Sequence, residues 1–375
     1  MKIAERFDKP AQAHRILLIQ LGDIGDVVWS LPALRAVREA FPRAVVAVLL
    51  REGNGLLLAA EASPPKIFEV RKGVGESLRL IRALRRVRFD FVLDFRGDER
   101  GAYTAFLTGA PVRAALYYSA LPWLRNHLFT HLVSPAGDVP ASGAADISLY
   151  ILRAFGIEAG NALPELRLSE GVRLRALKIL TGEGVAAAAE GSAVGEKDSA
   201  GPRTNGWVTV NPFSRWSYKE WGLEKWARIV DWLWTEFGVA AIIVGSSAER
   251  ERAEGLVRDC AGKVFNLAGR TTLAELAGVL QLSRLHIGVD SAAPHIAAAV
   301  GTPTVTLYGP SDWRYWAPPG ERNRVVVPDM ECAPCHQKGC EGSGTSLCLD
   351  TLEVAQVQAV LRDVLSVRRI PFPIP

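Results

Sequence analysis

The sequence lacks several features that would place it in a large class of proteins. No apolar run reaches the roughly 18 residues of a membrane helix, and the N-terminal MKIAERFDKPAQAHR has no apolar stretch like that of a signal peptide. We therefore expect a cytoplasmic protein without a transmembrane segment. Four of its five cysteines lie between Cys332 and Cys348, which is not the framework of a small disulfide-rich secreted domain.

An excess of one charge is also absent. The chain has 44 Lys and Arg against 40 Asp and Glu, and this balance excludes a dedicated nucleic-acid-binding protein. Two catalytic motifs are missing as well. The first glycine loop, GDIGD, is not the G-x-G-x-x-G of nicotinamide dehydrogenases, and no G-x-S-x-G elbow of a serine hydrolase occurs.

Short apolar strands alternate with helical segments along most of the chain. RILLIQL, AVVAVLL and FDFVLDF are strands of the first half, and WVTVNPF, VAAIIVG and RLHIGVD are strands of the second. This alternation predicts βαβ units with parallel sheets, and so an α/β fold. At 375 residues, two domains are expected.

We predict a first Rossmann-like domain over 1–185, a flexible linker or loop over 186–206 and a second Rossmann-like domain over 207–350. A C-terminal helix and a proline-rich tail occupy 351–375. Ligands of open α/β sheets bind at the carboxyl ends of the strands. A cleft between the two domains is therefore the expected site.

Polar residues follow the predicted strands. Asp23 and Asp26 come after the first strand, where they either cap a helix or act on a ligand. Asp290, Ser291 and Ala292 begin a later helix, whose N-terminus favours a phosphate.

Three further residues each allow two interpretations. His295, in the first turn of that later helix, is either a ligand donor or a structural histidine. Lys219, in a loop with Ser214, is either a surface lysine or a phosphate ligand. Glu249 follows a strand, where an acidic residue can accept hydrogen bonds from ribose; the charges around it are those of a solvated helix face.

The spacing Cys332-x2-Cys335-x4-Cys340-x7-Cys348 is dense but lacks the paired C-x2-C pattern of a zinc ribbon. Reduced thiols or a disulfide, a metal site and a catalytic thiol all stay open. We assign these cysteines no catalytic role.

Five blocks in order resemble the ADP-heptose:lipopolysaccharide heptosyltransferases, glycosyltransferase family 9. They are RILLIQLGDIGDVVWSLPALRAVREAFP, FDFVLDFRGDERGAYTAFLTGAPVRAAL, SRWSYKEW, NLAGRTTLAELAGVLQLSRLHIGVDSAAPHIAAAVGTPTVTLYGPSD and the cysteine cluster. YKEW with GVDSAAPHIAAA is more similar to the heptosyltransferase III branch. The resemblance implies a GT-B fold, two facing Rossmann-like domains, and metal-independent, inverting transfer of heptose from ADP-heptose to the lipopolysaccharide inner core.

The resemblance also implies roles for single residues. Asp26 matches the general base of the family, and Lys219 matches the lysine that stabilises the donor diphosphate. Donor contacts fall on Ser214, Lys219, Glu249, Asp290, Ser291, Ala292 and His295. Arg96 stands where the family usually has Gln, which suggests acceptor contacts by Arg96 and Arg100. No metal, cofactor or nucleic acid is expected.

The resemblance places the acceptor at a membrane surface, so we expect a cytoplasmic enzyme that can sit peripherally on the inner face of the inner membrane. Two alternatives stay open. One is the same fold transferring another nucleotide-linked sugar, and the other is a nucleotide-sugar-binding protein without catalysis. Turnover of the donor by the purified protein distinguishes the second alternative from an enzyme.

Overall fold

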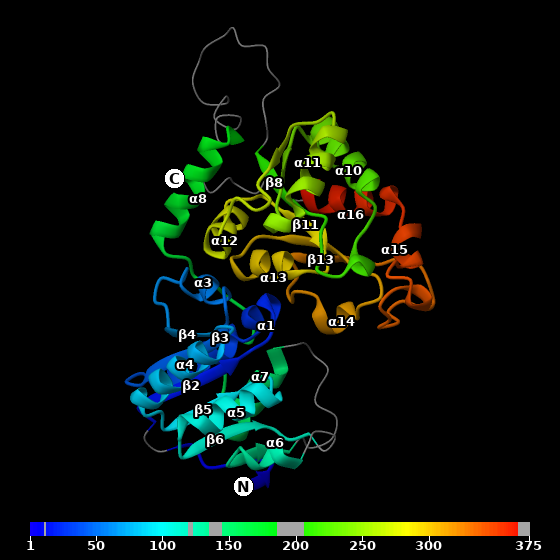
Figure 1. Cartoon of the computed structure of the whole chain (residues 1–375). Helices are drawn as coiled ribbons and strands as arrows, with labels where there is room; N and C mark the ends of the chain where they lie inside the picture. The colour runs from blue at the N-terminus through cyan, green and yellow to red at the C-terminus, as the bar shows by residue number, and fades with distance from the viewer. Residues whose placement is uncertain (11–12, 119–122, 135–144, 186–205, 367–375) are drawn as a thin grey trace. The chain divides into compact units, whose positions relative to one another are not determined.

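The computed structural model of the chain describes residues 1–10, 13–118, 123–134, 145–185 and 206–366 (Figure 1). The chain forms two compact units, unit 1 (Met1–Leu166) and unit 2 (Arg167–Pro375). Each unit is built around one parallel sheet. Among the helices of the described residues, none combines the length and apolar composition needed to span a bilayer.

Unit 1 contains a seven-stranded sheet in the order β1-β7-β6-β5-β2-β3-β4. Its strands are β1 (Lys2–Ala4), β2 (Arg15–Gln20), β3 (Val45–Arg51), β4 (Lys66–Val70), β5 (Phe91–Asp94), β6 (Val112–Leu116) and β7 (His131–Val133). Its helices are α1 (Ile24–Trp29), α2 (Leu31–Ala40), α3 (Gly55–Leu58), α4 (Val74–Val87), α5 (Glu99–Thr108), α6 (Trp123–His127) and α7 (Ala145–Ala154). Ile16 to Ile19 of β2 are fully buried because helices cover both faces of a parallel sheet.

Unit 2 contains a six-stranded sheet in the order β10-β9-β8-β11-β12-β13. Its strands are β8 (Trp207–Asn211), β9 (Ala240–Ile243), β10 (Val264–Asn266), β11 (His286–Val289), β12 (Thr304–Leu307) and β13 (Asn323–Val326). Its α-helices are α8 (Glu170–Gly182), α10 (Leu223–Phe237), α11 (Arg250–Asp259), α12 (Leu273–Gln281), α13 (Ala292–Ala299), α14 (Trp313–Trp316), α15 (Leu347–Thr351) and α16 (Val354–Ser366). Three 3₁₀ turns are η1 (Ser217–Lys219), η2 (Ser247–Glu249) and η3 (Cys340–Gly342).

The two sheets share one strand order. Six strands of each sheet, β2 to β7 in unit 1 and β8 to β13 in unit 2, can be numbered 1 to 6 along the chain. Across each sheet they then lie in the order 3-2-1-4-5-6, and β1 is added at the edge of the first sheet. This is the order of doubly wound dinucleotide-binding folds, whose ligands bind where the strand order reverses. The reversal lies between β2 and β5 in unit 1 and between β8 and β11 in unit 2.

The boundary between the units differs from the sequence prediction. We placed α8 in a first domain ending at residue 185, but the apolar side of α8 (Val172, Ala176, Leu180) packs on α12 within unit 2. A Cβ on Gly278 of α12 would lie 2.7 Å from the Cβ of Ala176, so the two helices are in close contact. The boundary therefore precedes α8, and the predicted linker follows α8 in the chain. Residues 186–205 of that linker lie outside the described residues.

The C-terminal helix is also part of unit 2 rather than a separate segment. Val357 and Leu361 of α16 are fully buried in the same apolar cluster as Trp226 of α10. The tail after Ser366 lies outside the described residues.

Candidate active site

Two groups of polar residues follow the strands that flank the two reversals. In unit 1, Asp23 and Asp26 follow β2, and Arg96 follows β5. We call Asp23, Asp26, Arg51 and Arg96 the Asp26 cluster. In unit 2, Asn211, Ser214 and Lys219 end or follow β8, and Asp290 and Ser291 follow β11. We call these five residues the Lys219 cluster.

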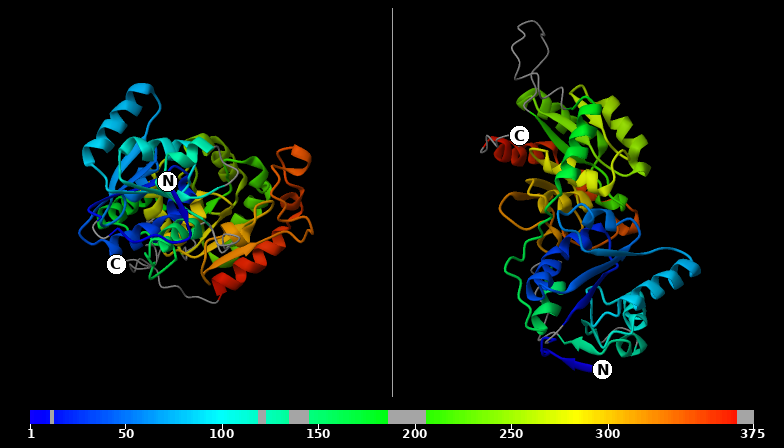
Figure 2. Two further views of the ribbon diagram at one scale, coloured as in Figure 1. Left: turned by 90° about the horizontal axis from the view of Figure 1, so that it is seen from below. Right: turned by 90° about the vertical axis from the view of Figure 1, so that its left-hand side faces the viewer.

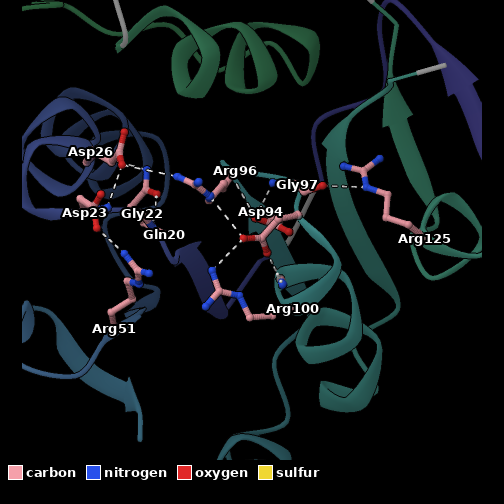
Figure 3. Close-up of polar contacts among 12 residues, drawn as sticks. Gln20, Gly22, Asp23, Asp26, Arg51, Asp94, Arg96, Gly97, Arg100 and Arg125 are labelled. Atoms are coloured by element: carbon pink, nitrogen blue, oxygen red, sulfur yellow. Dashed lines mark hydrogen bonds and ion pairs between the residues drawn. The ribbon is translucent and has the colours of Figure 1, made fainter. Parts of the chain in front are cut away.

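Asp26 caps its own helix with one carboxylate oxygen. Its Oδ2 accepts the backbone N–H of Asp23 at 2.8 Å, and Asp23 occupies the N-cap position of α1 (Figure 3). The predicted capping interpretation is therefore confirmed for this pair. Arg96 Nη1 lies 3.5 Å from the same Oδ2, while Arg51 pairs with Asp23. Among the described residues, these contacts use Oδ2 and leave Oδ1 of Asp26 for another partner.

The surroundings of Asp26 suit a base. Burial raises the pKa of its carboxyl, and the Asp23 N–H and the Arg96 guanidinium oppose that shift. The side chain still exposes 27% of its surface. A half-buried carboxylate with a raised pKa takes up a proton more readily than a solvated one.

Asp94 fixes the turn that carries Arg96. Its Oδ1 accepts the backbone N–H groups of Arg96 at 3.1 Å and Gly97 at 2.9 Å. Gly97 has a φ of 66°, and a Cβ there would lie 2.3 Å from Nη2 of Arg125, whose Nε donates to the Gly97 carbonyl at 2.8 Å. The sequence analysis missed Asp94 and Arg125. The only signal for Asp94 was an acidic residue at the end of an apolar strand, just before Arg-Gly.

The Asp94 carboxyl should make stability depend on pH. An ordinary aspartate has a pKa of 3.8, whereas complete burial raises the pKa of Asp94 to about 7. Between these values the folded chain binds one more proton than the unfolded chain, so the free energy of unfolding falls as pH rises, by about 4 kcal/mol in total.

The amide of Asp94→Asn cannot ionise, so the fall in the free energy of unfolding with rising pH should disappear in this variant. Its amide oxygen can still accept the two backbone N–H groups. Denaturant unfolding of both proteins at about pH 4 and about pH 8 measures the difference. If wild type and variant changed equally with pH, Asp94 would titrate as an ordinary aspartate.

Asp98 joins the two arginines predicted to contact the acceptor. Its Oδ2 lies 3.3 Å from Arg96 Nε and 3.3 Å from Arg100 Nη2, and its Oδ1 accepts the Gly101 N–H at the start of α5. Arg96 thus bridges Asp98 and Asp26. The Arg100 side chain is 60% exposed and lies outside direct contact with Asp26.

The Lys219 cluster brings together residues far apart in sequence. Lys219 Nζ lies 2.6 Å from Asp290 Oδ2, and Ser214 Oγ donates to the backbone carbonyl of Asp290 at 3.2 Å. Asn211 Nδ2 donates to Ser291 Oγ at 3.0 Å. The Lys219 side chain is only 22% exposed, so it is not a freely solvated surface lysine. Asn211 was absent from the sequence prediction, although it ends the strand before the lysine loop.

The helix after Asp290 begins as predicted. Ser291 is the N-cap of α13, Ala292 is its first residue, and His295 in its first turn is buried. Burial lowers the pKa of His295 to about 4, so the imidazole is neutral near pH 7. A neutral imidazole donates one hydrogen bond but adds no positive charge to this helix start.

Glu249 lies beside a different strand. Its Oε2 accepts the Ser246 N–H at 2.6 Å, which caps η2 after β9. Because β9 pairs with β8, Glu249 follows the strand next to the one that leads to Lys219. The described contacts do not join Glu249 to the Lys219 cluster, and ribose binding stays a prediction.

The cysteine-containing segment packs on the lysine loop. Ser346 Oγ donates to the Tyr218 carbonyl at 2.6 Å, and Ser217 Oγ donates to the Gly344 carbonyl at 2.9 Å. The four cysteines of this segment are free thiols in the structure. Burial raises the pKa of Cys348 to about 11, which disfavours its nucleophilic thiolate. The described residues contain no group of His, Cys, Asp and Glu side chains with the geometry of a metal site.

Comparison with known proteins identifies the family. Residues 77–345 match the model of glycosyltransferase family 9 (heptosyltransferase). Lipopolysaccharide heptosyltransferase 3 of Escherichia coli K12 is 25% identical over 78% of this chain and 82% of its own.

Two solved structures show the same fold. They are a family 9 glycosyl transferase from Veillonella parvula (TM-score 0.76, 21% identity, 95% of this chain and 98% of that one) and E. coli ADP-heptose lps heptosyltransferase II (TM-score 0.70, 20% identity, 94% and 99%). The fold is GT-B, as predicted. The chain is a glycosyltransferase and belongs to glycosyltransferase family 9, the heptosyltransferases.

Proposed function

We propose that this enzyme transfers a heptose from ADP-heptose to a hydroxyl of the lipopolysaccharide inner core, with inversion and without a metal. The family match over residues 77–345 is the observation that carries this proposal. Similarity to an E. coli ADP-heptose lps heptosyltransferase II and to a lipopolysaccharide heptosyltransferase 3 supports the donor, the acceptor and the III branch. The Asp26 and Lys219 clusters, each at a sheet reversal, supply the chemical groups that such a transfer needs.

In the proposed reaction, Asp26 takes the proton of the acceptor hydroxyl as its oxygen attacks the anomeric carbon. The bond between that carbon and the β-phosphate oxygen breaks at the same time, and ADP leaves with the bonding electrons. A single displacement of this kind inverts the anomeric centre. Arg96 contacts the acceptor from the turn fixed by Asp94, and Arg100 contacts it from the first turn of α5.

The donor is assigned to unit 2. The diphosphate lies at the start of α13, held by Ser291 and Ala292 with Lys219 beside it. Ser214, Asp290 and His295 shape this site, and Glu249 accepts from the ribose.

The proposal is tested by incubating the purified chain with a panel of nucleotide sugars, ADP-heptose among them, and a lipopolysaccharide core acceptor. The proposal is supported if product forms from ADP-heptose and from no other donor, and if it still forms when magnesium is chelated. Transfer of a different sugar, or a strict magnesium requirement, contradicts it. Binding of ADP-heptose without any turnover would favour a non-catalytic binding protein.

Ser346 should position Lys219 without touching the donor. Ser346→Ala removes the 2.6 Å hydrogen bond to the half-buried Tyr218 carbonyl, a loss of about 0.5–1.5 kcal/mol, and loosens η1. We expect kcat to fall about tenfold, with a smaller change in the donor KM, because the lysine acts most strongly in the transition state. Ser343→Ala is the matched control, since within the described part of the chain Ser343 bonds only to its own loop. Equal kinetics of the two variants would contradict a positioning role.

A further inference from the structure

The helix α4 and its flanks carry a concentration of positive charge that the proposed chemistry does not use. Residues 71–88 contain seven basic residues and one acidic residue, a larger excess than the net charge of +4 of the whole chain. The basic residues are Arg71, Lys72, Arg79, Arg82, Arg85, Arg86 and Arg88, and all of them are exposed.

Most of this charge is not neutralised within the protein. In the described part of the chain, ion pairs from this segment involve only Arg71, with Glu52, and Arg79, with Glu76. The exposed helix α11 of unit 2 differs, because its three arginines are matched by three acidic residues. A solvated helix face of ordinary composition resembles α11 rather than α4.

The exposed side of α4 also presents apolar side chains. Leu84 packs into the core of unit 1, whereas Val74 and Leu78, one turn apart, are 80% and 50% exposed. In both views of Figure 2, α4 (light blue) extends away from the strands of unit 1. A helix with basic and apolar residues on its exposed side has the composition of helices that lie in a membrane interface.

The neighbouring helix continues this surface to the candidate active site. α5 packs beside α4 (Figure 1). It exposes Tyr103 and Phe106. Tyr103 is one turn along α5 from Arg100, the proposed acceptor contact. Aromatic side chains are favoured at the level of lipid headgroups. A membrane against α4 and α5 would therefore place a glycolipid acceptor beside the Asp26 cluster.

We propose that α4 and α5 form a docking surface for an anionic membrane, with the basic side chains on lipid phosphates and the four exposed apolar side chains in the interface. The partner is the phospholipid surface itself. The proposal adds to the proposed function, on which it rests for the membrane location of the acceptor.

The test measures sedimentation of the full-length chain with vesicles of phosphatidylcholine alone or mixed with phosphatidylglycerol. The double variant Arg82→Gln, Arg86→Gln keeps good helix formers and removes two cations. Each cation near an anionic surface contributes about fivefold to binding, so the variant should bind mixed vesicles about 25-fold more weakly than wild type. Arg175→Gln, Lys178→Gln on α8, also an exposed pair one turn apart, is the matched control and should bind like wild type.

Added salt should release wild type from the mixed vesicles. Three results would overturn the proposal: no binding of wild type to mixed vesicles, equal binding to pure phosphatidylcholine, or equal binding of wild type and the Arg82, Arg86 variant. Absence of any vesicle binding would instead favour a protein partner for α4.

Heptose transfer to a water-soluble core oligosaccharide, measured separately, tests the proposed function without a membrane. The Arg82, Arg86 variant should keep this activity. Failure of wild type in this assay would contradict the proposed function and leave the vesicle result standing.

Discussion

Replacing Asp26 by Asn should lower turnover roughly a hundredfold or more while leaving donor affinity nearly unchanged. The amide keeps the size of the side chain and can still accept the Asp23 N–H, so α1 keeps its cap. It cannot take the acceptor proton. Burial raises the pKa of the native carboxyl, which makes Asp26 a stronger base than a solvated aspartate, and this advantage is lost entirely in the amide.

Steady-state kinetics, together with calorimetric binding of ADP, would separate these effects. Asp23→Asn is the matched control, because Asp23 occupies the N-cap of the same helix but pairs with Arg51. Its replacement should act through stability or loop geometry. Near-normal turnover in Asp26→Asn would show that another group accepts the proton.

The sequence predicted the position of the candidate site better than its internal contacts. Asp26 and Lys219 could be found because each follows an apolar strand in a family-like block. The ion pair between Lys219 and Asp290 could not be read from the sequence, because the two residues are 71 positions apart. They meet only because β8, which precedes Lys219, pairs in the sheet with β11, which precedes Asp290. Asp94 was missed for a similar reason, since its role depends on the turn that places Arg96 beside Asp26.

The domain boundary could not be predicted from periodicity. An amphipathic helix shows that one side is buried, but not against which partner. α8 follows the strands of unit 1 in the chain, yet Ala176 packs on Gly278, about a hundred residues later. The short strands β1, at the edge of the first sheet, and β7, next to it, were missed because three residues are too few to show a period.

Replacing Lys219 by Ala should reduce turnover more than it weakens donor binding. As the proposed sugar bond breaks, the β-phosphate gains negative charge, and a fixed cation stabilises that charge more than it stabilises the bound donor. The structure explains how the cation is fixed. Asp290 Oδ2 lies 2.6 Å from the ammonium group of Lys219. Ser346 holds the backbone next to Lys219 by donating to the Tyr218 carbonyl.

We expect kcat to fall about a hundredfold in Lys219→Ala, the effect typical of one preorganised donor. Lys219→Arg should restore only part of it, because a planar guanidinium does not reproduce the short contact of the ammonium with Asp290. Lys225→Ala is the matched control: Lys225 donates to the Leu352 carbonyl, so its loss should lower the free energy of unfolding without lowering kcat. Kinetics with added magnesium and with a chelator complete the test. Undiminished turnover in Lys219→Ala would remove the lysine from the mechanism, and rescue of that variant by magnesium would show that a metal can supply the missing charge.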